Sequence, residues 1–472
     1  MEIKFCGAAG SVTGSKHYVS CDSFQFLVDC GMVQERANAG RNWEPFLDDP
    51  SALDAVLLTH AHLDHCGLLP KLVADGFNGK IYGTHATLDL TQLILLDSAH
   101  IQEEDAAYKR KRHARENRTP ARPVATLYTE ADVERTVKLF QPIPYSKATR
   151  IAPGVDVVFR EAGHILGSAF IEVTLSKPQI QEDAPRRLIF SGDLGRANRP
   201  ILRDPEFYTE PNDVFNLFIE STYGDRISAP IDTVDDQLAE VINRAYERNG
   251  KIIMPVFAVE RAQEVLYRLA SLIANGRIPD QIPIFLDSPM AVEATMIFSR
   301  HKECFDEQTL ESLEKLRSSL TNLKLLKTRE ESQKLNKMSG SAIIMASAGM
   351  CNAGRIKHHL ANHIESPRNI VVFLGYQAEG TLGRIILSGA SPVRILGESH
   401  PVRAEIVQIR GISGHADQAE LLAWYSAIPR RPATTFVVHG EQSAAETLAE
   451  KIREIAPETV VHAPSYGEIY KE

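Results

Sequence analysis

Residues 59–67 read Thr-His-Ala-His-Leu-Asp-His-Cys-Gly and gather three imidazoles and one carboxylate within a few positions. They follow an apolar stretch, residues 53–58, whose composition is typical of a buried strand. Alternate side chains of a strand point to the same side, so the first two histidines can bind one ion, and a turn would direct the later aspartate and histidine toward a second. These ligand types suit Zn²⁺ or a similar cation, which makes bound water nucleophilic near neutral pH. The run predicts a site for two ions, with His60, His62, Asp64 and His65 as ligands.

Three other predicted strand ends carry ligand-type side chains that could complete such a site. His164 lies between glycines after the apolar residues 155–159, and Asp193 lies between glycines after another apolar run. An isolated aspartate at a strand end is more often a turn residue than a ligand. The repetition of the same pattern favours the ligand interpretation. Asp29, which follows residues 24–28, is expected to orient a ligand histidine from outside the coordination sphere.

These motifs resemble those of a known family. The HxHxDH, AGHxLGS and SGD motifs, at residues 60–65, 162–168 and 191–193, are similar to the metal-ligand motifs of the metallo-β-lactamase superfamily. Further segments resemble its β-CASP branch of nucleases, which are related to the mRNA 3′-end processing endonuclease and its bacterial and archaeal counterparts. They are residues 254–264, 347–355, 375–384, 413–417 and 438–441, so the resemblance covers essentially the whole chain. One departure is Glu260, where many relatives have glycine in a turn.

The resemblance implies an α/β fold in which a metallo-β-lactamase αββα sandwich carries an inserted β-CASP domain. In the middle of the chain, apolar strands alternate with helical patterns such as residues 261–274. This alternation predicts a mostly parallel sheet that is covered on both faces. We expect a metallo-β-lactamase domain formed by residues 1–210 and 393–472, and a β-CASP domain at residues 211–392.

The resemblance also implies roles for individual residues and two Zn²⁺ ions per chain. Proton transfer falls to Glu220 and His415, because cleaving a phosphodiester expels an alkoxide that needs a proton. Without the resemblance, Glu220 is equally well explained as a solvated residue at a strand end. His415 is equally well explained as a residue that precedes a helix at 417–425. A histidine at position 439 is typical of the RNA-directed members. The first ion would be held by His60, His62 and His164, the second by Asp64, His65 and His439, with Asp193 bridging; Asp64 and Asp193 join His415 and Glu220 as catalytic residues.

Small and cationic residues near the strand ends of the inserted domain are candidates for binding substrate phosphates. Hydroxyl and backbone N–H groups can bind phosphate, and arginine binds it through forked hydrogen bonds. A plain turn explains each glycine equally well, and a surface ion pair explains each arginine. The candidates are Ser347, Gly349, Arg355, Gly380, Thr381 and Arg384.

Composition limits the kinds of partner. The 472 residues are 43% hydrophobic and 24% charged, which is ordinary for a globular protein. The formal net charge of −9 argues against nonspecific binding of nucleic acid over the whole surface, so a polyanion must be bound locally. The cysteines form no CxxC pair, and the sequence shows no signal-like leader and no membrane-spanning segment. We expect a cytoplasmic enzyme whose partner is single-stranded RNA and not a membrane; a homodimer is compatible with this.

A basic segment at residues 109–122 has two interpretations. Its lysines and arginines follow an acidic stretch, which is typical of a solvated helix face or a loop. The same residues could instead form a strip that binds RNA without sequence preference, because basic side chains displace counterions from any nucleic acid.

The motifs together favour a zinc-dependent ribonuclease in RNA processing or decay. It would use a two-metal-activated hydroxide and a histidine general acid, and both endonuclease and exonuclease activity fit the motifs. Two rivals are a hydrolase of thioesters or lactones, which shares the HxHxDH core, and a noncatalytic subunit of an RNA-processing complex. The inserted domain disfavours the first, and the retention of a competent residue at every motif position disfavours the second.

Overall fold

The computed structural model describes the chain except residues 22–23, 36, 117–123 and 177–184. The described residues form two compact units. Unit 1 comprises residues 1–197, 204–227 and 415–472, and unit 2 comprises residues 198–203 and 228–414.

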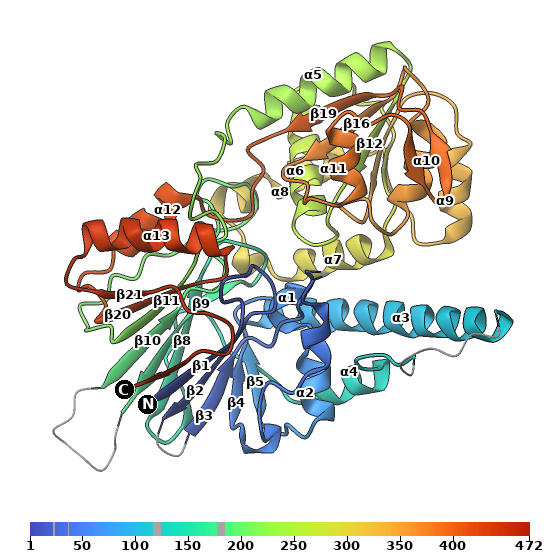
Figure 1. Ribbon diagram of the computed structural model, residues 1–472. Helices are drawn as coiled ribbons and strands as arrows, with labels where there is room; N and C mark the ends of the chain where they lie inside the picture. Colours follow the sequence, from blue (N-terminus) through green and yellow to red (C-terminus); the bar gives the residue numbers. More distant parts are fainter. Residues whose placement is uncertain (22–23, 36, 117–123, 177–184) are drawn as a thin grey trace. The chain divides into compact units, whose positions relative to one another are not determined.

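Unit 1 is built on two mixed sheets that pack face to face (Figure 1). The first contains β1 (Glu2–Gly7), β2 (Lys16–Cys21), β3 (Phe24–Val28), β4 (Ala55–Leu57), β5 (Lys80–Gly83), β6 (Phe140–Pro142) and β22 (Ile469–Lys471), in the order β22-β1-β2-β3-β4-β5-β6. The second contains β7 (Thr149–Ala152), β8 (Val155–Glu161), β9 (Ala169–Leu175), β10 (Arg186–Phe190), β11 (Asn216–Glu220), β20 (Thr434–Val438) and β21 (Val460–His462), in the order β21-β20-β11-β10-β9-β8-β7. One apolar core joins their inner faces, where the rings of Phe26 and Phe190 meet edge to face with centroids 6.3 Å apart.

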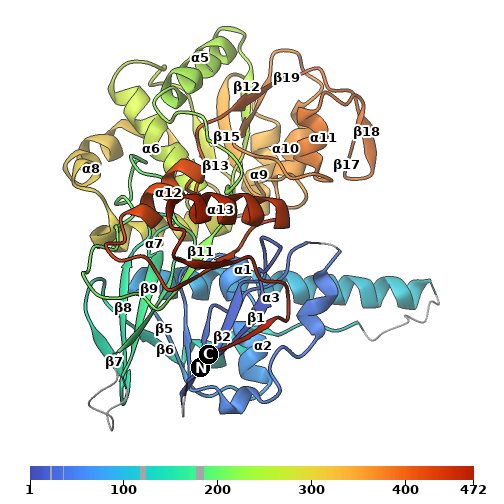
Figure 2. The same cartoon turned by 60° about the vertical axis from the view of Figure 1, so that its left-hand side comes forward.

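Helices cover the outer faces of both sheets (Figures 1 and 2). On the second sheet, Leu448 and Ile452 of one helix pack against Leu217 and Val437, because the helix presents apolar residues at a helical spacing. This arrangement confirms the predicted αββα sandwich. The helices against the first sheet are α1 (Leu63–Cys66), α2 (Leu69–Ala74), α3 (His85–Arg115) and α4 (Glu130–Val137), those against the second are α12 (Gln418–Ser426) and α13 (Gln442–Ile455), and two short 3-10 helices are η1 (Ala39–Trp43) and η2 (Pro50–Ala52).

Unit 2 contains a six-stranded sheet in which every strand is parallel to its neighbours. Its strands are β14 (Leu323–Leu325), β13 (Ile284–Leu286), β15 (Ala342–Ala346), β12 (Lys251–Pro255), β16 (Ile370–Leu374) and β19 (Glu405–Ile409), in that order, and β17 (Val393–Ile395) pairs separately with β18 (Glu398–His400). The central strands are buried along their whole length, as expected for a sheet covered on both faces.

Two apolar cores lie on the two faces of this sheet. The helices of unit 2 are α5 (Val234–Glu247), α6 (Arg261–Ala274), α7 (Pro289–Arg300), η3 (Lys302–Cys304), α8 (Glu307–Ser319), α9 (Arg329–Asn336), α10 (Ile356–His363) and α11 (Leu382–Leu387). Helices α5, α6 and α7 contribute to one core, and α9, α10 and α11 to the other. Across the described parts of both units, no helix combines the length and apolar character needed to cross a bilayer.

The boundaries between the units differ from the expected positions 210/211 and 392/393. Strand β11 belongs to unit 1 because it pairs in parallel with β10 and β20, with Asn216 opposite Thr434. Strand β19 belongs to unit 2 because it pairs with β16, with Ile370 opposite Glu405. The long segment of unit 2 therefore runs from residue 228 to residue 414, and residues 198–203 also belong to that unit.

Glu260, the departure from the family pattern, precedes α6 at a backbone φ of 69°. This is a region that glycine adopts more readily than other residues. Its carboxylate is buried and accepts a hydrogen bond from Arg199, 3.1 Å away, which also donates to Glu264 at 3.0 Å. The glutamate thus keeps the glycine-like turn and gains a partner in a buried ionic network.

Candidate metal centre

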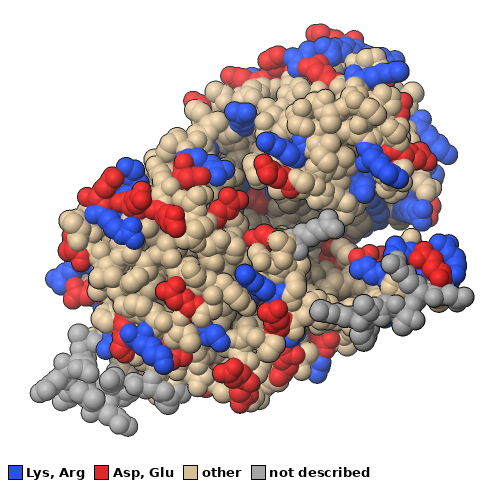
Figure 3. Space-filling view, viewed as in Figure 1, with Lys and Arg blue, Asp and Glu red and all other residues tan. Residues whose placement is uncertain are grey.

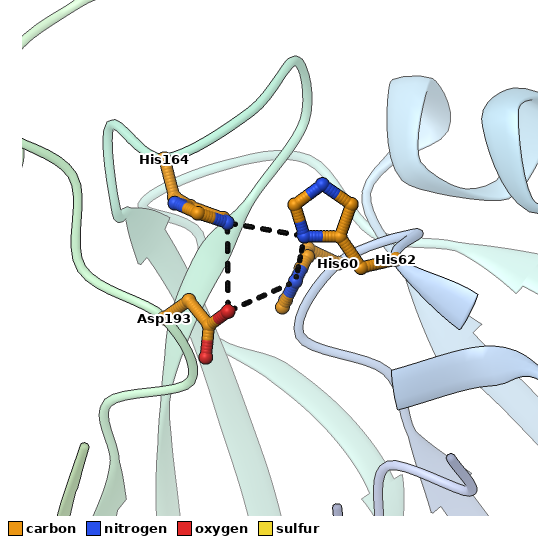
Figure 4. Close-up of side chains that lie close together, drawn as sticks. All are labelled: His60, His62, His164 and Asp193. Atoms are coloured by element: carbon orange, nitrogen blue, oxygen red, sulfur yellow. Dashed lines mark hydrogen bonds and ion pairs between the residues drawn. The ribbon is translucent and has the colours of Figure 1, made fainter. Parts of the chain in front are cut away.

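Four of the predicted ligands converge at the ends of strands in unit 1 (Figure 4). Nδ1 of His62 lies 3.1 Å from Nε2 of His60 and 3.1 Å from Nε2 of His164. Oδ2 of Asp193 lies 3.4 Å from both Nε2 atoms. Four electron-pair donors therefore face a common point.

A second group of ligands lies beside the first. Nε2 atoms of His65 and His439 are 2.9 Å apart, and Nε2 of His439 lies 3.7 Å from Oδ2 of Asp64. The other oxygen of Asp193, Oδ1, lies 3.3 Å from Nε2 of His65. The carboxylate of Asp193 thus presents one oxygen to each group. Instead of the expected turn, a short helix, α1, carries Asp64 and His65.

The loops that carry these ligands approach closely and are braced by hydrogen bonds. A Cβ atom at Gly195 would lie 1.8 Å from the carbonyl oxygen of Gly163, so only glycine lets the loops of Asp193 and His164 meet. The hydroxyl of Ser168 accepts hydrogen bonds from the backbone N–H of His164 at 3.0 Å and of Ile165 at 3.3 Å.

The start of α3 holds the far side of the His164 loop. Hydroxyls of Thr84 and Thr87 each donate to the carbonyl oxygen of Gly167 at 2.7 Å. Thr84 is also the N-cap of α3, where it accepts from the backbone N–H of Thr87. The first turn of this long helix is therefore hydrogen-bonded to the loop that carries a candidate ligand.

Hydrogen bonds behind the ligands fix which ring nitrogen points at the cluster. Asp29 lies 2.7 Å from Nδ1 of His65, which leaves Nε2 of that ring directed at the cluster; this is the contact that the orienting role proposed for Asp29 requires. The hydroxyl of Thr59 donates to Asp29 and lies 3.1 Å from Nδ1 of His60. The hydroxyl of Thr222 donates to the carbonyl oxygen of His439 and lies 3.1 Å from Nδ1 of the same residue.

Sequence reasoning gave no role to these supporting hydroxyls. Thr59 and Ser168 lie inside the motifs that carry His60 and His164, and Thr222 follows Glu220 by two positions. Their places in the motifs were a usable signal, because a histidine ligand commonly donates its second ring N–H to an oxygen nearby.

Removal of the Thr222 hydroxyl should weaken the ion held by His439. In Thr222→Val, the ring of His439 loses the oxygen that fixes its tautomer, and we expect metal affinity at that position to fall about 10–100-fold. Zinc titration against a competing chelator measures the change. Thr222→Ser keeps the hydroxyl and serves as the matched control; affinity kept in Thr222→Val but lost in Thr222→Ser would show that the methyl contacts, and not the hydrogen bond, matter.

Burial and neighbouring charges set the protonation of the cluster. Burial, followed by the effect of His65, lowers the pKa of His60 well below its usual value, so this imidazole is neutral, as a ligand must be. Burial alone would lower the pKa of His65, but Asp193 and Asp29 raise it well above its usual value. Burial opposes ionisation of Asp193, yet the histidines beside it hold its pKa well below the usual range. The carboxylates thus favour positive charge here, which protons or metal cations can supply.

The donor set fits a divalent cation. The ligand atoms within each group lie within 4.8 Å of one another, and they are the imidazole nitrogens and carboxylate oxygens that such ions take. Oδ1 of Asp193 is buried and, within the described residues, receives no hydrogen bond of good geometry. A buried charged oxygen without a donor is costly unless a cation compensates it.

His415 and Glu220 form a third group that also includes Asp193. Nδ1 of His415 lies 3.4 Å from the Glu220 carboxylate and 3.8 Å from Oδ2 of Asp193. Glu220 is fully buried, and its Oε1 accepts from the backbone N–H of Leu194 at 2.7 Å, which ties it to the Asp193 loop. Burial opposes protonation of His415, but Glu220, followed by Asp193 and Asp64, raises its pKa to about 9. His415 is partly exposed, so an imidazole that is held by a carboxylate lies at the solvent-facing edge of the cluster.

The six candidate phosphate ligands lie in unit 2, in two segments that contact each other: one runs from β15 to the N-cap of α10, and the other leads into α11, which contains Arg384. Gly383 donates its backbone N–H to the carbonyl oxygen of Met350, which links the loop after β15 to the start of α11. Arg355 donates to the buried Asp287 at 2.6 Å and to the carbonyl oxygen of Lys327 at 2.7 Å, so its guanidinium is engaged in an internal ion pair. Ser347, Gly349, Gly380, Thr381 and Arg384 make no such ion pair within the described residues, and their phosphate role stays a prediction.

Comparison with known proteins bears on both units. Sequence models of three domains match: a metallo-beta-lactamase superfamily domain at residues 18–180, a Beta-Casp domain at residues 262–386, and a Zn-dependent metallo-hydrolase RNA specificity domain at residues 399–464. Ribonuclease TTHA0252 of Thermus thermophilus is 36% identical over 446 residues, which cover 94% of each chain.

Archaeal proteins are also similar. An RNase J-like protein of Methanocaldococcus jannaschii is 29% identical, covering 95% of each chain. Transcription termination factor FttA of Methanosarcina mazei is 31% identical, covering 96% of this chain and 69% of the factor. A crystal structure of a protein of unknown function from Enterococcus faecalis superposes with a TM-score of 0.57 at 13% identity, covering 99% of both chains, which bears on the fold alone.

Proposed function

The chain belongs to the β-CASP branch of the metallo-β-lactamase superfamily, and on this premise we propose that it is a zinc-dependent ribonuclease that hydrolyses phosphodiester bonds of single-stranded RNA. The observation that carries the proposal is the pair of adjacent ligand groups that share the Asp193 carboxylate. An enzyme that cleaves phosphodiesters needs compensation for charge on both the attacking and the leaving oxygen, and paired metal sites supply it.

Each group would hold one zinc ion. His60, His62 and His164 belong to the first ion and Asp64, His65 and His439 to the second, with Asp193 reaching both. The ions would supply Lewis-acid chemistry by activating water and by neutralising charge on the phosphate. The protein keeps the imidazoles oriented through Asp29, Thr59 and Thr222.

His415 would donate the proton that the leaving oxygen needs. Glu220 is buried and holds Nδ1 of His415, so Nε2 is the atom that would donate. The partial exposure of His415 suits contact with a substrate, whereas the buried Glu220 acts only through the histidine.

An RNA substrate is supported by two observations from different parts of the chain. His439 stands where RNA-directed members of the family have histidine, and the match to an RNA specificity domain spans residues 399–464. Two of the similar proteins are named as ribonucleases.

Purified protein should cleave an end-labelled, unstructured RNA with weak preference for sequence, because phosphate contacts position a strand without reading its bases. We expect little activity on duplex DNA of the same sequence and none on thioester or lactone substrates. Gel analysis of labelled products at matched substrate concentrations measures these differences.

A chelator is the control for contaminating nucleases. DNA cleaved more efficiently than RNA would overturn the role given to His439. Turnover of a thioester without RNA cleavage would replace the proposed function with that of another hydrolase of the superfamily.

A further inference from the structure

Helix α3 continues well beyond the body that it packs against. It has 31 residues, and its last buried residue is Ala106. From Ala107 to Arg115 every residue is exposed or partly exposed, and Figure 1 shows this part of α3 extending past the first sheet and past α4. An extension with so few buried side chains gains little stability from packing, which leaves its surface available for another role.

The extension carries a dense set of cations that we call the basic tip. It consists of Lys109, Arg110, Lys111, Arg112 and Arg115, with no acidic residue among positions 109–115. Figure 3 shows basic side chains at the end of α3, with acidic side chains among them. Two further arginines of this segment, Arg118 and Arg122, lie outside the described residues.

Few of these charges are compensated within the protein. Among the described residues, the ion pairs of the tip amount to one contact, 3.8 Å from Nε of Arg112 to Glu116. Arg110 donates to the carbonyl oxygen of Val124 at 3.2 Å, which leaves its charge unneutralised. Lys111 and Arg115 are four positions apart on the helix, a spacing at which like charges repel.

Stabilisation of the helix terminus explains only part of this pattern. Cations in the last turn interact favourably with the helix dipole, and Arg112 and Arg115 lie there. Lys109, Arg110 and Lys111 lie a turn earlier, where this effect has faded. Among the described residues, no ion pair joins the upstream acids Glu103, Glu104 and Asp105 to the tip, and Glu104 pairs with His100.

The position of the tip relative to the ligands follows from the helix itself. The first turn of α3 holds the His164 loop through Thr84 and Thr87. From His85 to Lys109 there are 24 positions, which at a rise of ~1.5 Å per residue place the tip about 36 Å from that end. A stacked strand with one phosphate per ~3.4 Å needs roughly ten nucleotides to cover that length.

We propose that the basic tip of α3 is a second binding site for the phosphate backbone of single-stranded RNA, remote from the metal centre and reached only by longer substrates. The inference rests on the proposed ribonuclease function. The tip binds without reading bases, and it raises the local concentration of a long strand at the metal centre through a second attachment point. The exposed Tyr108 beside the cations offers a ring on which a base can stack.

The test compares one variant, K109Q/R110Q/K111Q/R112Q, on RNAs of two lengths. Glutamine preserves helix propensity while removing charge. For an unstructured 30-nucleotide RNA, measured by fluorescence anisotropy with a chelator present to prevent cleavage, we expect affinity to fall at least about tenfold at low salt, with a shallower salt dependence. For a four-nucleotide RNA, we expect cleavage by the metal-loaded variant to keep the wild-type kcat/KM. Circular dichroism checks that the helix remains folded.

A matched control removes four exposed cations of unit 1 that lie elsewhere, in K80Q/K147Q/R430Q/K471Q. This variant has the same net charge as the tip variant, so a loss confined to the tip variant reports the site and not the overall charge. Equal losses in both variants, or an unchanged affinity for the long RNA, would overturn the proposal.

Two further outcomes distinguish the RNA-binding role of the basic tip from the proposed ribonuclease function. If the wild type fails to cleave any RNA but the tip variant still loses binding of the long RNA, the proposed function fails and the binding site stands. If the tip variant loses binding to vesicles of anionic lipid and keeps its RNA affinity, the tip belongs to a membrane-binding surface and the RNA assignment is wrong.

Discussion

Stripping the purified protein with a chelator should abolish its RNA hydrolysis, and restoring about two equivalents of zinc per chain should return it. The reason is the composition of the two ligand groups, which place imidazoles and carboxylates around two adjacent points. Elemental analysis of the protein as purified should find about two zinc ions per chain. Asp193→Ala should reduce both, because each group includes an oxygen of that carboxylate.

Asp48→Ala is the control, because this aspartate is exposed and lies outside the ligand groups. The metal assignment is wrong if carefully purified protein contains only trace metal and its activity is unchanged by the chelator. Loss of a single ion in Asp193→Ala would refute the bridging role alone and leave the rest of the site intact.

Proton competition should accompany metal binding. Asp193 and Asp29 raise the pKa of His65, so a proton competes with a cation for this ring. Metal affinity is therefore expected to weaken as pH falls, because each protonated ligand must first release its proton.

Part of the candidate ligand set could be predicted from local sequence, because these side chains come shortly after strands that are recognisable from their own residues, whereas His439 is assigned only through the family resemblance. His60, His164 and Asp193 all come within a few positions of β4, β8 and β10. The sheets then bring these strand ends together without requiring any unusual local structure. His439 follows β20 in the same way, at the far end of the chain.

The boundary between the units could not be read in the same way. Strand β11 looks like any apolar strand, and its place in unit 1 depends on pairing with β20, more than two hundred positions later. The partner of Arg355 is equally remote in sequence, since Asp287 lies 68 positions earlier. A single sequence shows local patterns, whereas such pairings are decided by tertiary packing.

His415→Ala should lose roughly 10²–10⁴-fold in turnover of RNA while retaining its full zinc content. Glu220 holds the imidazole toward the cluster, but His415 belongs to neither of the two groups that would bind the ions. Its loss removes a proton donor and leaves the metals in place. An RNA leaving oxygen is strongly basic and needs that proton, whereas a nitrophenolate does not. On bis(p-nitrophenyl) phosphate, the same variant should therefore remain close to the wild type.

His439→Ala provides the contrast, because it removes a ligand of the second group. This variant should lose about one zinc ion per chain and should be impaired on RNA and on the nitrophenyl ester alike. Zinc content and the two activities, measured together, distinguish a proton donor from a ligand. If His415→Ala also loses zinc, or if it is impaired equally on both substrates, the histidine supports the metals and the proton must come from another group.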